Sequence, residues 1–186
     1  MKRLMDILVS VLAMAALLVP CLFVALLIRL TSRGPSIYWS ERVGLGGRIF
    51  WMPKFRTMLV DTPIIATGLL KSPEGYITGI GKFLRSTSID EIPQLYSVLR
   101  GDMSLVGPRP VLPSETELLS KRLASGVQNL RPGITGLAQI NGRDHVSIDD
   151  KVALDKEYLL TQSILLDVRI LWATCFYILS RKDITH

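Results

Sequence analysis

The longest apolar segment of the chain lies near its N-terminus. From Ile7 to Ile28 there are 22 residues without a charge, and Ser10 carries the one hydroxyl group among them. A stretch of this length can reach across a bilayer. It ends at Arg29 without the small-residue cleavage pattern that follows the shorter apolar core of a signal peptide. We therefore expect residues 1–33 to form a retained membrane-anchoring helix.

Two features of this segment leave its path through the membrane open. Pro20 lies inside the run, where it removes a helix hydrogen bond and bends the helix. A spanning helix usually has one basic end, but here both ends are basic, with Lys2, Arg3, Arg29 and Arg33. The pattern fits a simple span. It also fits a re-entrant helix that breaks at Pro20 and returns to the face it entered.

The segment after the anchor has the pattern of a β-hairpin over residues 36–58. Ser36–Arg42 and the stretch beginning at Arg48-Ile-Phe-Trp are rich in β-branched and aromatic residues. The turn between them, Gly44-Leu-Gly-Gly47, supplies the glycines that a tight connection needs. We expect this hairpin to be the main β-structure of the molecule.

Helical patterns dominate the rest of the chain. They cover Lys82–Arg85, Pro93–Arg100, residues 114–124, residues 148–160 and an apolar tail over 164–179. Pro93 favours a helix start and Gly101 a helix stop. In the tail, Trp172 and Tyr177 are suited to headgroup depth, so we expect this helix to lie in the membrane interface. The predicted fold class is α+β, mainly helical, with amphipathic interfacial helices and no linker that would divide residues 34–186.

Composition agrees with a membrane-attached protein that meets anions. The chain has 186 residues, is 48% hydrophobic with a mean hydropathy of +0.34, and carries a net charge of +6. These values exclude a disordered chain, a collagen and a disulfide-rich scaffold. Cys21 and Cys175 both lie in apolar stretches, so we expect reduced thiols. The excess positive charge indicates lipid headgroups or phosphorylated substrates as partners.

The candidate chemistry centres on two consecutive carboxylates, Asp90 and Glu91. One interpretation is structural: Asp90 caps the following helix, or Ser88 and Glu91 form a capping box. The functional interpretation uses the same position, since neighbouring carboxylates can hold a Mg²⁺ that also binds substrate phosphates. An ionised aspartate can then attack phosphorus to form an aspartyl-phosphate intermediate. The residue pattern by itself leaves both interpretations open.

Basic residues surround this pair in the sequence. Arg85 lies five residues upstream, and Arg109 is fixed between Pro108 and Pro110, which suits bidentate phosphate binding. Lys54 and Arg56, in the segment KFRTM, add two further candidate phosphate ligands. We expect all four cations to bind substrate phosphates.

Several other chemistries lack support in the sequence. The chain has two histidines, His145 and His186, which argues against a histidine-based zinc site or an acyl-transfer triad. There is no Walker A motif and no GxGxxG motif, so any nucleotide is bound in another way. No feature indicates nucleic acid as a partner.

Three ordered motifs resemble those of the bacterial sugar transferases. They are KFRTM (54–58), the segment from Asp90-Glu91 through VGPRP (106–110), and RPGITGLAQINGRD (131–144). The likeness extends from Lys2-Arg3-x-x-Asp6 to about Lys182, and the chain is similar to the small monotopic phosphoglycosyl transferases, such as the one that initiates bacterial N-linked protein glycosylation.

The resemblance implies a reaction with two substrates. A sugar-1-phosphate passes from a UDP-sugar to undecaprenyl phosphate with release of UMP, and Mg²⁺ is the cofactor. Asp90 is implied to be the nucleophile and a Mg²⁺ ligand, and Glu91 to assist it. Arg85 and Arg109 match phosphate-binding positions, and Asp155 and Asp167 match acidic positions that support the site.

The resemblance also implies an arrangement in the bacterial inner membrane. The family's anchor is a re-entrant helix broken at a proline, here Pro20, although Val19 replaces the serine that often precedes it. Residues 34–186 are then a catalytic domain on the cytoplasmic face of a monotopic protein. The compact form suggests an N-acetylated amino or diamino sugar, with gluco- and galacto-configured donors as alternatives. Two other functions stay open: a membrane-bound nucleotide-sugar pyrophosphatase or phosphodiesterase, and a non-catalytic membrane-tethered module.

Overall fold

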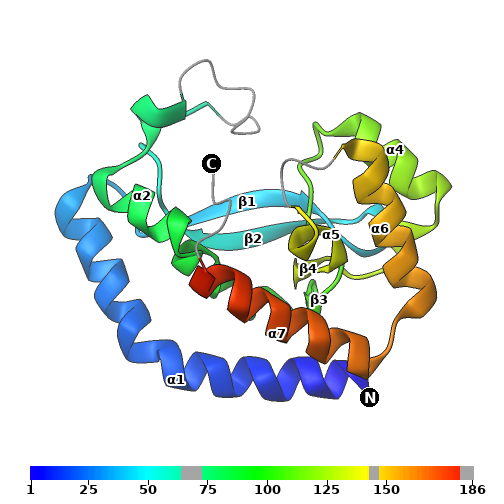
Figure 1. The fold of residues 1–186 in the computed structure, drawn as a ribbon. Coiled ribbons are helices and arrows are strands. Elements are labelled where there is room, and N and C mark those ends of the chain that lie inside the picture. Colours follow the sequence, from blue (N-terminus) through cyan, green and yellow to red (C-terminus); the bar gives the residue numbers. More distant parts are fainter. Residues whose placement is uncertain (64–72, 143–146, 181–186) are drawn as a thin grey trace.

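The computed structural model describes residues 1–63, 73–142 and 147–180, and this part of the chain is mainly helical. Helix α1 spans Lys2–Thr31 and contains Pro20. The predicted break at Pro20 is not seen, because α1 is one uninterrupted helix whose ribbon bends partway along without unwinding (Figure 1). A proline removes only its own backbone hydrogen bond, so the neighbouring turns keep the helix continuous through a bend.

The predicted hairpin is present, and its two strands lie within the predicted residues 36–58. Strand β1 (Ile37–Val43) pairs antiparallel with β2 (Ile49–Phe55) around the short turn η1 (Leu45–Gly47), where Gly46 has a φ of 63°. Alternation along β2 buries Phe50 and Met52 on one face, as a half-buried strand requires. The second strand of the hairpin, β2, contains the start of the KFRTM segment.

The predicted helices are all present, with shifted ends. They are α2 (Gly79–Ser86), α3 (Leu95–Arg100), α4 (Thr116–Ala124), α6 (Ile148–Thr161) and α7 (Ile164–Ser180). Pro93 does not start α3; it lies inside a preceding 3-10 helix, η4 (Ile89–Gln94). Gly101 ends α3 as predicted, with a left-handed φ of 96°. Two further short 3-10 helices are η3 (Pro73–Tyr76) and η5 (Val127–Asn129).

A second, parallel strand pair was not predicted. Strand β3 (Ser104–Val106) pairs with β4 (Gly133–Thr135), and the one-turn helix α5 (Leu137–Ile140) follows β4. The two chain segments nearly touch beyond β3, where a Cβ on Gly133 would lie 2.1 Å from the nitrogen of Gly107. Glycine is therefore required at this crossing, which holds the VGPRP segment against RPGITG. The main core forms around these strands, with Met103, Leu105, Val106, Tyr158 and Ile170.

The N-terminal end of α1 is bound to this core by polar contacts. Arg3 donates to the carbonyl oxygens of Val98 at 2.6 Å and Leu99 at 2.9 Å, near the end of α3. Helix-terminal carbonyls lack partners of their own, so the guanidinium satisfies them. Asp6 is buried and accepts a hydrogen bond from the Ser104 hydroxyl at 2.9 Å. The start of α1 is thus part of the folded domain.

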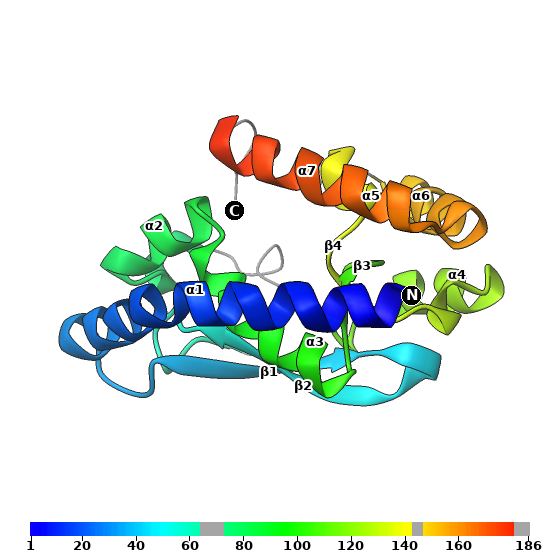
Figure 2. The same ribbon diagram turned by 90° about the horizontal axis from the view of Figure 1, so that it is seen from below.

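The C-terminal end of α1 is bound to the same domain. Ile28 is fully buried against Phe55 of β2 and Leu84 of α2. Arg56 donates to the carbonyl oxygen and hydroxyl of Ser32 at 3.0 and 2.7 Å, and also to the Arg33 carbonyl. In Figure 2, which views the molecule from below, α1 runs across its near face. Both ends of the helix therefore rest on one domain.

Candidate active site

The two predicted carboxylates lie in η4, which packs on β2. Ser88 precedes them with a left-handed φ of 56°, unusual for a residue with a side chain, and its hydroxyl makes no capping bond. The capping-box interpretation for Ser88 and Glu91 is therefore wrong. Asp90 lies inside the 3-10 helix and does not cap the following helix α3, whose N-cap is Gln94. Asp90 is buried, with 8% of its surface exposed. A buried carboxylate without a capping role calls for another explanation.

The environment of Asp90 opposes its ionisation. Burial raises its pKa to about 6, and the neighbouring Glu91 carboxylate adds to the rise. Lys54, Arg85 and Arg109 act in the opposite direction. The structure thus brings together five of the predicted site residues, and the burial of Asp90 outweighs the three cations in setting its pKa.

Glu91 fixes two of these cations beside Asp90. Its Oε1 atom lies 2.8 Å from Nζ of Lys54 and 3.4 Å from Nη2 of Arg109. Lys54 comes from β2 and Arg109 from the loop after β3, so Glu91 joins two distant segments. Both cations remain partly exposed, which leaves them accessible to a phosphate.

Asp155 supports the site through a residue that the sequence analysis missed. Its Oδ2 atom accepts from Nε and Nη2 of Arg122 at 3.0 and 2.6 Å, and both side chains are buried. Nη1 of Arg122 donates to the backbone carbonyl of Arg109 at 2.8 Å. Burial raises the pKa of Asp155, and the guanidinium opposes the rise. The available signal for Arg122 was its position four residues after Leu118, on the buried face of α4.

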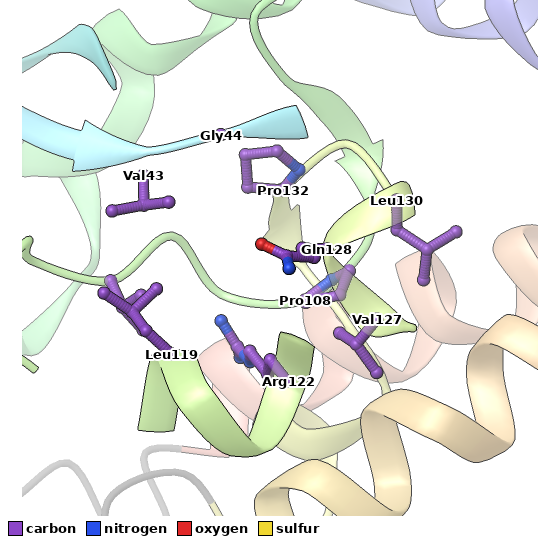
Figure 3. A pocket seen from close by; sticks show the side chains of 10 residues that line it. Val43, Gly44, Pro108, Leu119, Arg122, Val127, Gln128, Leu130 and Pro132 are labelled. Carbon is purple, nitrogen blue, oxygen red and sulfur yellow. The ribbon is translucent and has the colours of Figure 1, made fainter. Parts of the chain in front are cut away.

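Arg122 also borders a small cavity under the Arg109 loop. Figure 3 shows its side chain beside Leu119, below Pro108. The cavity has a volume of about 30 Å³, room for a water molecule but not for a sugar nucleotide. This void belongs to the packing of the loop.

Asp167 supports the segment just before Arg109. It is fully buried and accepts from the Tyr158 hydroxyl at 2.6 Å and from Lys2 Nζ at 2.6 Å. Lys2 also donates to the carbonyl of Val106 at 3.1 Å. Asp167 therefore joins α7, α6 and the start of α1 beneath the VGPRP segment.

Arg56, predicted as a phosphate ligand, is not among the charged residues that act on Asp90. Its guanidinium is buried and bound to Ser32 and Arg33 at the end of α1, which gives it a structural task away from Asp90. Arg85 lies in the last turn of α2 and acts on Asp90 through its charge.

A larger cavity, of about 220 Å³, opens beside the carboxylates. Its lining includes Ser88, Glu91 and Arg109 from the site and Leu171, Thr174 and Cys175 from α7. It also includes Gln139 of α5, a buried residue that the sequence analysis did not single out. Of the two carboxylates, Glu91 lines this cavity, which is large enough to admit part of a substrate.

The donor set is compatible with Mg²⁺ held partly by the substrate. Within residues 1–63, 73–142 and 147–180 there is no cluster of three or more His, Cys, Asp or Glu residues. Mg²⁺ commonly uses one or two carboxylates together with phosphates and water, and Asp90 and Glu91 are such a pair. A bound cation would also lower the pKa of Asp90.

The buried carboxylate, the fixed cations and the adjoining cavity together form the candidate active site. Comparison with known proteins identifies the family: the bacterial sugar transferase profile matches residues 1–181, and the chain belongs to this family.

Curated relatives match nearly the whole chain. Undecaprenyl-phosphate glucose phosphotransferase of Komagataeibacter xylinus is 42% identical over 184 residues, covering 93% of this chain and 35% of that protein. Exopolysaccharide production protein ExoY of Sinorhizobium fredii is 37% identical, covering 93% and 83%. Undecaprenyl-phosphate galactose phosphotransferase of Salmonella typhimurium is 36% identical, covering 97% and 41%. The chain thus spans less than half of two of these three relatives.

Proposed function

We propose that this protein transfers a sugar-1-phosphate from a UDP-sugar to undecaprenyl phosphate and releases UMP. The observation that carries the proposal is the buried Asp90 beside Glu91, with Lys54, Arg85 and Arg109 arranged around the pair. Family membership and the names of the relatives support a polyprenyl phosphate as the acceptor. Those names also favour a hexose such as glucose or galactose over the amino sugar that the compact form suggested.

In the first step, an oxygen of the ionised Asp90 attacks the phosphorus that carries the sugar. A bond forms between this oxygen and phosphorus, and the bond from phosphorus to the UMP oxygen breaks, with its electron pair leaving on UMP. The attack needs the carboxylate form, so with a pKa of about 6 Asp90 is ready to react at neutral pH. Lys54, Arg85 and Arg109 stabilise the charge that develops on the phosphoryl oxygens.

In the second step, a phosphate oxygen of undecaprenyl phosphate attacks the same phosphorus. The bond to Asp90 breaks, the carboxylate is restored, and the sugar-bearing diphosphate stays on the lipid. Asp90 and Glu91 would hold Mg²⁺, which supplies additional neutralisation of phosphate charge. Using one site twice lets a soluble donor and a lipid acceptor react without meeting.

We further propose a monotopic arrangement at the cytoplasmic face of the bacterial inner membrane. Both ends of α1 rest on one domain, whereas a spanning helix would carry its ends to opposite sides of the bilayer. Many apolar side chains of α1 are nevertheless exposed on the protein surface, including Leu12, Val19 and Leu22 at 70, 74 and 62%. On α7, Trp172 and Phe176 are 78 and 72% exposed. A re-entrant α1 with its bend in lipid, next to an interfacial α7, accounts for these surfaces.

The test is to trap the covalent intermediate. Purified protein is incubated with UDP-sugar labelled in the sugar and without undecaprenyl phosphate. We expect about one equivalent of UMP and a labelled protein, and we expect the label to move to lipid when the acceptor is added. Asp90→Asn should abolish both labelling and transfer, whereas Asp61→Asn, a change at an exposed acid, should leave both intact.

The alternatives give different outcomes. Continuous UMP release without the acceptor would indicate a pyrophosphatase or phosphodiesterase. Full activity of a folded Asp90→Asn variant would exclude the nucleophile, and no UMP release from wild type under any condition would favour a non-catalytic module.

A further inference from the structure

The cavity that Glu91 and Arg109 line has a buried side-chain amide in its wall. Gln139 is 8% exposed and lines this cavity of about 220 Å³. Within the part of the chain that the structure describes, neither its amide oxygen nor its amide nitrogen has a hydrogen-bond partner. Buried side-chain amides in native proteins are nearly always hydrogen-bonded, so an amide with both ends unsatisfied at a cavity wall points to a bound molecule.

Its neighbours do not offer the missing bonds. The hydroxyl of Thr174 donates to the Ile170 carbonyl at 2.7 Å. The hydroxyl of Thr135 lies 2.7 Å from that of Thr174 and is therefore the donor between the two. This pair is therefore satisfied by itself. The amide oxygen of Gln139 lies close to Gly136, where an added Cβ would approach it to 2.8 Å. Because Gly136 has no side chain, the amide of Gln139 has room beside it.

The rest of the lining defines the chemistry of the occupant. Ser88, Glu91, Arg109 and the mutually bonded Thr135 and Thr174 also line the cavity. The rest of its walls are mainly apolar, with Ile92, Leu95, Leu105, Ile134 and Leu171. A sugar presents hydroxyl groups on all sides, which these walls would leave unpaired, and an isoprene unit would leave the amide unpaired. A flat ring with apolar faces and one edge carrying an adjacent donor and acceptor satisfies both features. The imide edge of uracil, N3–H beside a carbonyl oxygen, is such an edge.

We propose that Gln139 is a specificity-determining residue that binds the uracil ring of the donor through a bidentate amide–imide pair. The inference rests on the proposed function, which supplies a UDP-sugar. Glu91 and Arg109 line the same cavity, so a nucleotide whose base lies against Gln139 extends its phosphates toward the cations. Side-chain amides recognise nucleobase edges by the same two-bond geometry in nucleic-acid complexes.

A donor methylated at N3 of uracil tests this pairing. In wild type, kcat/KM for the methylated UDP-sugar should be about 10- to 100-fold lower than for the unmodified donor. In Gln139→Leu, kcat/KM for the unmodified donor should fall by a similar factor, and the methylation penalty should shrink to about twofold. Gln128→Leu, a change of the same kind at the small cavity under the loop, should retain the full penalty.

A binding measurement separates this inference from the proposed reaction. Cys175 is exposed and lines the cavity, so in a Cys21→Ser background its alkylation reports occupancy. UMP should protect it in wild type, and Gln139→Leu should require at least about tenfold more UMP. Protection that follows this pattern without any transfer activity would sustain the uracil site while the proposed function fails.

Two results would overturn the inference. One is an unchanged methylation penalty in Gln139→Leu. The other is a variant that alters discrimination between epimeric sugars while UMP protection stays as in wild type, since Gln139 would then bind the sugar.

Discussion

Asp90 lies in a site that makes its charged form unfavourable. Its pKa of about 6 persists although three cations act on it, and two of those cations are also bound to Glu91. The carboxylate therefore ionises at neutral pH against the desolvation that burial imposes. Groups kept in this condition are typical of functional sites, where the destabilised form is the reactive one.

Asp90→Asn is therefore expected to stabilise the fold at neutral pH. A pKa raised from 3.8 to about 6 means that the folded state binds the Asp90 proton more tightly than the unfolded chain does. The stability that this proton confers is fully present below pH 3.8 and is lost as the pH rises through about 6. The loss at neutral pH corresponds to about 3 kcal/mol, and an asparagine does not incur it.

Thermal unfolding in one detergent at pH 7.5 and at pH 4 measures this difference. The asparagine variant should have the higher Tm at pH 7.5, and most of that advantage should disappear at pH 4. Asp61→Asn serves as the control. A wild type that is the more stable of the two at pH 7.5 would mean that the cations outweigh burial.

At the scale of the elements, the site depends on buried contacts from four helices to the Arg109 loop and the segment before it. Asp155 of α6 binds Arg122 of α4, and Arg122 binds the backbone of Arg109. Asp167 of α7 and Lys2 of α1 meet below Val106, just before the same loop. The loop that carries Arg109 is thus fixed from two sides, and its geometry reflects the packing of four helices.

The pair of Asp155 and Arg122 can be tested separately for its two tasks. Asp155→Asn leaves a buried guanidinium without its counterion and should destabilise the fold by about 3–5 kcal/mol. The double variant Asp155→Leu/Arg122→Met removes both charges, so its Tm should return close to that of wild type. Covalent labelling by the donor should stay at least about tenfold slower in this variant, because the Arg109 carbonyl has lost its donor. Recovery of both stability and labelling rate would show that Arg122 serves packing alone.

The elements that the sequence predicted well are those defined by local signals. Alternation and glycines gave the hairpin, and Gly101 marked the end of α3. The pairing of β3 with β4 was not predicted, because each strand has only three residues and its partner is distant in the chain. Asp90, Glu91 and Arg109 could be proposed because they lie in recognisable sequence motifs, whereas Arg122 and Gln139 could not be singled out. Their importance arises from burial and from contacts that only the folded chain creates.

At the scale of the whole molecule, α1 belongs both to the domain and to the apolar surface. A straight helix of 30 residues is roughly 45 Å long, longer than the hydrocarbon core is thick. Its first turn binds α3 and β3, and its last turn packs on β2 and α2. Sequence hydropathy recognised the apolar run but could not show that both ends return to one domain, which depends on contacts distant along the chain.

This geometry predicts that both ends of α1 are accessible from one side of the membrane. An epitope tag at the N-terminus and a cysteine introduced by Arg33→Cys, in a Cys21→Ser/Cys175→Ser background, report the two ends. Membrane-impermeant reagents should reach both in inverted vesicles and neither in spheroplasts. Val19→Cys is the matched control, because the protein itself leaves Val19 74% exposed and only lipid can shield it. It should resist labelling from either side. Labelling of the tag and of position 33 from opposite sides would establish a span, and the two ends of α1 could then not both rest on the domain that forms the site.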